Sequence, residues 1–152
     1  MRYEQIGLTG CKLVGAMVGL ISHLGPKHHA IVIGKSLQDG LVYVAEHMNT
    51  GYQLETLESF KSRYGSKGRI KIIENDGQFD NVTVARRALE EIKRGGRGVY
   101  NLVTNNCECF ANRAMYGKSS SQQVINTTAA CIGLLAIGAV TSMYYSSKNN
   151  GN

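Results

Sequence analysis

The stretch NNCECFANRAMYGK, residues 105–118, places a cysteine in the first turn of a predicted helix. An Asn side chain at position 105 or 106 can cap this helix, because its oxygen accepts a hydrogen bond from a free N–H group of the first turn. Gly117 followed by Lys118 is a typical stop signal. Apolar residues recur between these ends at the spacing of one helix face, and they are Cys107, Phe110, Ala111, Ala114 and Met115.

Cys107 has two interpretations at this position. Its side chain points toward the core, where cysteine is a common small residue. It also lies at the positive end of the helix dipole, which favours the thiolate form. This stretch alone leaves both roles open, a buried core residue and a nucleophile.

Composition limits the class of protein. A chain of 152 residues is long enough for one domain with its own core. Lys and Arg outnumber Asp and Glu by 17 to 11, and a formal charge of +6 suits nucleic acid or an anionic membrane face. The sequence lacks aromatic residues interleaved with basic ones, zinc-finger spacing and a basic helical stripe, which argues against nucleic acid. The four cysteines are scattered and indicate a reducing compartment rather than a disulfide framework.

The remaining periodicity predicts an α+β domain. An apolar segment, residues 13–24, is interpreted as buried or lying on a membrane surface just ahead of the sheet. Strands are predicted over residues 28–34, 41–45 and 69–73, and helices over 55–64 and 81–93. The second of these helices is capped by Asp80 or Asn81, and its inward residues are Val84, Ala85, Ala88, Leu89 and Ile92.

The first two strands form a predicted antiparallel hairpin. If Gly34 pairs with Leu41, the register sets His28 opposite His47, with Cβ atoms about 5 Å apart. A shift of one residue would present Glu46 instead. A cysteine nucleophile needs a base within hydrogen-bond reach and a third group that orients the base. The hairpin therefore supplies His28 as the base, with His47 or Glu46 beside it.

The C-terminal part of the sequence has a different character. Residues 119–147 carry no charge, and their apolar part, residues 127–145, has 19 residues. That length is close to the ~20 residues needed to span a bilayer, and Tyr144 and Tyr145 stand at its far end as interfacial aromatics do. A buried core helix is the alternative. We expect a domain over residues 1–122 and a hydrophobic, membrane-spanning tail over 123–152.

Two motifs resemble the signature boxes of the lecithin:retinol acyltransferase family, which includes small phospholipid acyltransferases and phospholipases. They are His28-x-Ala30-Ile31-x-Ile33-Gly34 and Asn106-Cys107-Glu108-x-Phe110. The resemblance spans residues 26–124 and implies a permuted papain-like fold, in which an antiparallel sheet packs against helices. A C-terminal membrane helix is similar to that of several family members.

The resemblance also implies roles for individual residues. Cys107 matches the nucleophile and His28 the general base. The second histidine of the family matches His47, with Glu46 as the alternative third member. The family motif usually reads Asn-Cys-Glu-His-Phe, and Cys109 replaces its histidine here.

The function implied is a thiol-dependent acyltransferase or phospholipase that acts on glycerophospholipid esters through an acyl-cysteine, without cofactor or metal. Its partners would be phospholipid and a membrane, with the catalytic domain on the cytoplasmic side. The alternatives are a cysteine peptidase or amidase of the same fold, and a catalytically silent membrane-anchored module. A metal site built from histidines and Cys107 or Cys109 lacks any established ligand spacing; the histidines are His23, His28, His29 and His47.

Overall fold

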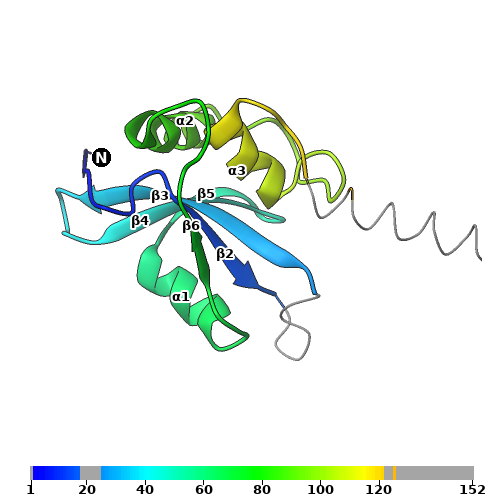
Figure 1. Cartoon of the computed structure of the whole chain (residues 1–152), viewed down its shortest axis with the longest axis horizontal. Helices are drawn as coiled ribbons and strands as arrows, with labels where there is room; N and C mark the ends of the chain where they lie inside the picture. The colour runs from blue at the N-terminus through cyan, green and yellow to red at the C-terminus, as the bar shows by residue number, and fades with distance from the viewer. Residues whose placement is uncertain (1, 18–24, 122–124, 126–152) are drawn as a thin grey trace, which may run out of the picture. The chain divides into compact units, whose positions relative to one another are not determined.

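The computed structural model describes residues 2–17, 25–121 and 125. By its internal contacts the chain divides into residues 1–121 and 122–152, and the account below concerns the first unit. It contains an antiparallel sheet with helices on both faces (Figure 1), so the predicted α+β class is confirmed. The strands are β1 (Tyr3–Glu4), β2 (Lys12–Ala16), β3 (Lys27–Ser36), β4 (Val42–Met48), β5 (Gly51–Thr56) and β6 (Lys71–Ile73). The helices are α1 (Leu57–Gly65), α2 (Asn81–Lys93) and α3 (Cys107–Tyr116).

Strand β3 lies at the centre of the sheet, whose order is β5-β4-β3-β2-β6, with β1 also paired to β3. Side chains alternate between the two faces of a strand, so β3 contributes to two separate cores. Helices α2 and α3 cover one face and α1 covers the other (Figure 1). The first core includes Ile31, Ile33, Ala45, Val84, Phe110 and Met115, and the second Leu13, Ala30, Val32, Val44, Phe60 and Tyr64.

The predicted ends of the cysteine helix are confirmed. The side chain of Asn106 accepts a hydrogen bond from the N–H of Cys109, 2.9 Å away, and caps α3. Gly117 ends the helix in the left-handed conformation, with φ of 72°, which glycine adopts without a steric penalty. The helix thus begins at the candidate nucleophile itself.

Two segments differ from the sequence prediction. Lys12–Ala16 forms an inner strand of the sheet between β3 and β6 rather than a segment ahead of it, while residues 18–24 lie outside the described part. The predicted helix over 55–64 starts later, because Thr56 ends β5 and then caps α1 by accepting a bond from the N–H of Ser59.

The predicted register of the β3–β4 hairpin is wrong. The Ser36 N–H bonds to the Leu41 carbonyl, which closes a tighter turn than Gly34–Leu41 pairing would give. Near the turn Gly34 pairs with Tyr43. An irregularity between Val32 and Gly34 then changes the register by one residue, so that Ala30 pairs with Glu46. Since neighbouring positions face opposite sides, His28 shares a face with Glu46 and not with His47.

The predicted hydrophobic helix over residues 127–145 lies outside the described residues. Among those that are described, no helix is long and apolar enough to cross a bilayer.

Gly15 allows α1 to approach the sheet closely. It pairs with His28 across β2 and β3, and a Cβ placed there would lie 2.6 Å from the Cβ of Tyr64. The Tyr64 ring stacks on the His28 ring at 5.1 Å between centroids. The packing of α1 and the position of His28 therefore depend on the same glycine.

We expect Gly15→Ala to lower the free energy of unfolding by about 1–3 kcal/mol, the usual cost of overpacking a filled core. Urea denaturation measures this change. Gly7→Ala is the matched control, because a Cβ at Gly7 meets no atom within 4 Å. Equal midpoints for the two variants would show that α1 moves away without cost.

Candidate active site

Cys107 lies buried where α3 meets the start of β3. Its side chain is 3% exposed, and its Sγ is 3.7 Å from the carbonyl oxygen of Lys27, the residue before His28. The Cys107 side chain is also close enough to His28 to raise the pKa of the His28 imidazole. The structure therefore brings together the nucleophile and the base that the sequence predicts.

The other partner of His28 is Glu46. The Nε2 atom of His28 lies 2.8 Å from Oε2 of Glu46, and both side chains are buried. The second carboxylate oxygen of Glu46 accepts hydrogen bonds from Nε2 of Gln53 and from the guanidinium of Arg63. A buried carboxylate with this many donors is fixed in position and compensated in charge.

These contacts change the protonation of the pair. Burial alone lowers the pKa of His28, but its hydrogen bonds to Cys107 and Glu46, with the charges of both groups, raise that pKa to about 9. Burial raises the pKa of Glu46, yet the hydrogen bonds from His28, Gln53 and Arg63 outweigh burial and lower it. At neutral pH the pair is thus a carboxylate beside an imidazolium.

His47 lies on the opposite face of the sheet and does not contact His28 through any hydrogen bond among the described residues. Neither of its ring nitrogens has a partner there. Its ring stacks on Tyr52 at 3.7 Å and meets the edge of Tyr100 at 5.0 Å. Burial and the nearby charge of Arg113 lower its pKa to about 4. The structure therefore places Glu46, the alternative third member, where His47 was expected.

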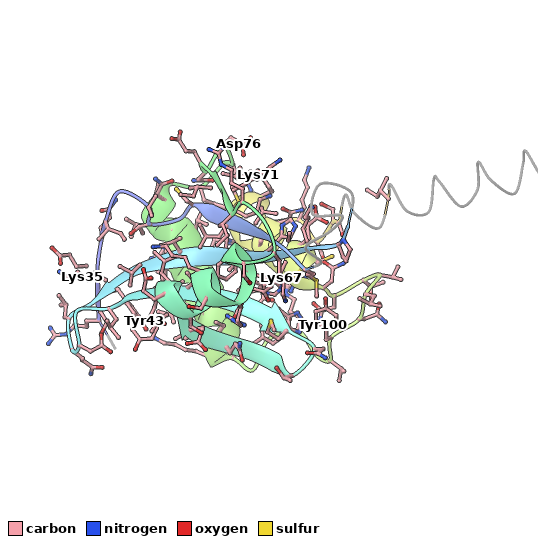
Figure 2. The ribbon with its side chains drawn as sticks, turned by 90° about the horizontal axis from the view of Figure 1, so that it is seen from below. Lys35, Tyr43, Lys67, Lys71, Asp76 and Tyr100 are labelled. Carbon is pink, nitrogen blue, oxygen red and sulfur yellow. The ribbon has the colours of Figure 1, made fainter. Side chains whose placement is uncertain are left out.

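Tyr100, in the loop between α2 and α3, also contacts Cys107. The side chain and the backbone of Cys107 both act on the pKa of its hydroxyl group, in opposite directions. Burial and the Cys107 side chain raise the pKa of Tyr100 to about 12, so it remains a neutral hydrogen-bond donor. Figure 2 shows Tyr100 at one end of the domain.

Three further residues at the site were not predicted from the sequence: Gln53, Arg63 and Tyr100. Gln53 carries a usable signal: Met48 pairs with Gly51 across a two-residue turn, and this turn sets Gln53 opposite Glu46. Arg63 and Tyr100 reach the site from a helix and a loop, and no local pattern indicates such contacts.

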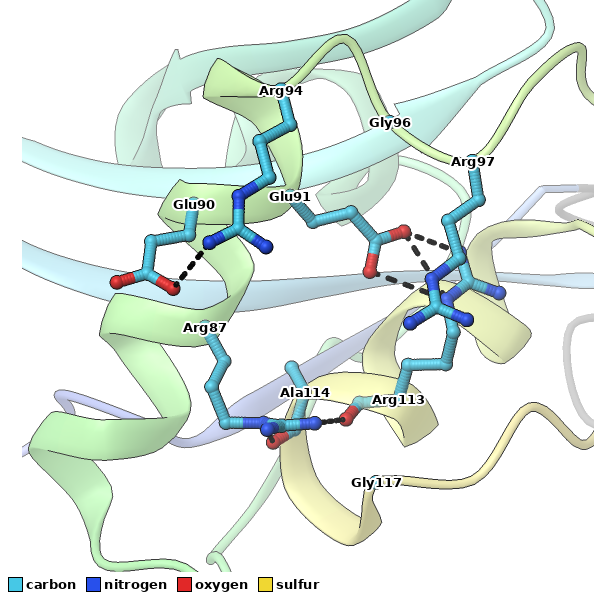
Figure 3. Close-up of a pocket in the computed structure, with 9 residues that line it drawn as sticks. All are labelled: Arg87, Glu90, Glu91, Arg94, Gly96, Arg97, Arg113, Ala114 and Gly117. Carbon is cyan, nitrogen blue, oxygen red and sulfur yellow. Dashed lines mark hydrogen bonds and ion pairs between the residues drawn. The ribbon is translucent and has the colours of Figure 1, made fainter.

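Cys109, the departure from the family motif, is 2% exposed and packed inside the domain. Within the described residues, no group of three or more His, Cys, Asp or Glu side chains is arranged to hold a metal ion. A separate polar hollow lies between α2 and α3 (Figure 3) and is lined by none of the predicted site residues.

Comparison with known proteins agrees with the motifs. Residues 19–120 match the family model described as lecithin retinol acyltransferase. No match was found among curated proteins or among solved structures.

The buried, unpartnered ring of His47 predicts a pH effect on stability. Its pKa is about 4 in the folded protein and 6.5 ordinarily, so the unfolded chain takes up a proton first as the pH falls through that window. Stability is therefore lost on acidification. We expect His47→Phe to lose less stability than the wild type between pH 6.5 and 4, measured by urea denaturation at each pH.

His29, whose pKa burial also lowers to about 4, keeps part of the acid sensitivity in both proteins. If the variant and the wild type lost equal stability over this window, protonation of His47 would not be the cause.

Proposed function

The chain belongs to the lecithin retinol acyltransferase family, and from this premise we propose that it transfers or hydrolyses acyl groups of glycerophospholipids through an acyl-cysteine. Family membership suggests acyltransferase or phospholipase activity in general. The observation that carries the finer proposal is the buried relay in which Cys107 contacts His28 and His28 contacts Glu46.

The first half of the reaction forms the acyl-cysteine. Because Nε2 of His28 faces Glu46, Nδ1 of the His28 imidazolium holds the proton that the Cys107 thiol gives up. The thiolate attacks the ester carbonyl carbon, and the C–O bond of the ester then breaks. The departing lysophospholipid oxygen takes the proton from His28.

The second half releases the acyl group. Water, or an alcohol or amine acceptor, attacks the thioester carbonyl and gives its proton to His28. The thiolate of Cys107 leaves, and His28 keeps the proton, which restores the starting pair. Water as acceptor gives a phospholipase, and an alcohol or amine gives an acyltransferase.

The N-terminus of α3 supports the charge that develops on the carbonyl oxygen. The Cys107 N–H and the Tyr100 hydroxyl meet beside the thiol. Both can donate to an oxyanion, which is commonly the largest electrostatic contribution in acyl transfer. Glu46 acts through His28 and is a positioning residue. It takes the role that was predicted for His47.

A cysteine peptidase or amidase would use the same relay. The net charge of +6 and the predicted hydrophobic tail favour a lipid substrate instead. We propose that the tail holds the domain at a membrane, on the cytoplasmic side. The intact relay argues against a catalytically silent module.

The proposal predicts a covalent adduct on Cys107. After exposure to phospholipid, mass spectrometry should find one fatty-acyl chain on this residue, and hydroxylamine should remove it. Cys107→Ser should lower turnover by about 10³-fold or more, because the nucleophile is lost. Cys109→Ala is the matched control and should keep both adduct and turnover. An adduct on Cys109, or none on any cysteine while turnover continues, would refute the mechanism.

The relay also predicts the order of two further variants. Glu46→Gln should lower kcat by roughly 10²-fold or more, since an orienting carboxylate is lost, and should move the alkaline limb of the pH–rate profile to lower pH, because Glu46 helps to raise the pKa of His28. His47→Phe should have a much smaller effect and leave that limb in place. If His47→Phe had the larger effect, His47 and not Glu46 would be the residue that orients His28.

A further inference from the structure

The loop between α2 and α3 exposes an unusual number of apolar side chains. Val99 is 89% exposed, Leu102 74% and Val103 62%, and the first two are the most exposed large apolar side chains among the described residues. Clustered apolar exposure of this kind marks an interaction site. We propose that the side chains of Val99, Leu102 and Val103, the apolar tip, insert into the surface of an anionic phospholipid bilayer; this rests on the proposed function and names the surface through which the site meets its substrate.

Charge around the apolar tip suits an anionic surface. Lys93, Arg94 and Arg97 are exposed on the segment that leads into it. Arg94 and Arg97 also line the polar hollow of about 150 Å³ shown in Figure 3. Each basic residue beside a membrane adds to the attraction for anionic lipid.

The acidic residues of the hollow do not cancel these cations. Glu91 is bound by the guanidinium of Arg113. Glu90 lies 3.8 Å from Arg94, a loose pair in which the Arg94 side chain stays 80% exposed. Arg97 forms no ion pair among the described residues. A net positive charge therefore remains next to the apolar tip.

The base of the loop is fixed while its tip is exposed. Asn105 Nδ2 donates to the carbonyl oxygens of residues 97, 98 and 99. Asn106, the cap of α3, donates through Nδ2 to the Leu102 carbonyl at 2.7 Å. A hydrogen bond thus joins the apolar tip directly to the helix cap that precedes Cys107. A bilayer bound by this tip would lie close to the start of α3, where Cys107 stands.

The size of the tip favours a bilayer over a protein partner. Three side chains in five residues are far from the ~800 Å² per partner that a stable protein interface buries. Shallow insertion of a few apolar groups, added to attraction between cations and anionic lipid, is sufficient at a membrane surface.

The sequence contains no tryptophan, so Leu102→Trp gives a single reporter in the full chain. The test uses phosphatidylcholine vesicles with and without phosphatidylserine. We expect a blue-shifted emission with phosphatidylserine present, quenching by lipids brominated in their acyl chains, and protection from aqueous iodide. The reporter senses its own surroundings, so anchoring by the tail alone does not produce this signal.

Leu37→Trp is the matched control. Leu37 is 63% exposed and follows Lys35, which lies at the end of the domain opposite Tyr100 (Figure 2). We expect its emission to stay unchanged on the same vesicles. Adding Arg94→Gln or Arg97→Gln to Leu102→Trp should in each case raise the vesicle concentration needed for a half-maximal blue shift by about fivefold.

Activity gives a second readout. The double variant Leu102→Ser/Val103→Ser should lower the ratio of turnover on vesicles to turnover on monomeric short-chain phospholipid by about tenfold. Leu37→Ser should leave this ratio unchanged.

Three outcomes would overturn the inference. The first is turnover on vesicles while the Leu102→Trp reporter stays accessible to iodide; this result would leave the proposed function standing. The second is an equal blue shift without phosphatidylserine. The third is a blue shift without lipid that rises with protein concentration, which would mean that a second copy covers the apolar tip. Membrane insertion without turnover on any phospholipid would instead refute the proposed function and leave the docking surface.

Discussion

The buried carboxylate of Glu46 is the constraint on which the site depends. A charge inside a protein is tolerated only when partners replace the water it has lost. Glu46 takes its partners from three elements: His28 on β3, Gln53 on β5 and Arg63 on α1. Sheet register, strand pairing and the seating of α1 must therefore all be correct before His28 is held beside Cys107.

Local signals explain what the sequence could predict. The helix that carries Cys107 has its cap at Asn106, its apolar period and its stop at Gly117 within a dozen residues, so each is readable without knowledge of the fold. The α+β class follows from elements of the same kind. The resemblance to the family was carried by two short motifs, and the family model confirms it. The permuted papain-like fold and the membrane tail stay predictions.

The third member of the relay was beyond such signals. Its identity depends on which face of β4 looks toward His28, and a single irregularity between Val32 and Gly34 reverses that answer. Arg63 is 17 residues from Glu46 in the sequence, and no periodic pattern predicts a contact over that separation. Patterns in a sequence predict elements well, whereas the pairing between elements decides the chemistry.

The enclosure of Glu46 limits how this protein can vary over time. A neutral side chain at position 46 would leave the guanidinium of Arg63 beside a buried site without its counter-charge, while loss of Arg63 would leave the carboxylate short of a donor. Replacements at positions 46, 53 and 63 are therefore expected to occur together. A histidine as the third group would therefore require a change at Arg63 as well, because the arginine would otherwise lack its counter-charge.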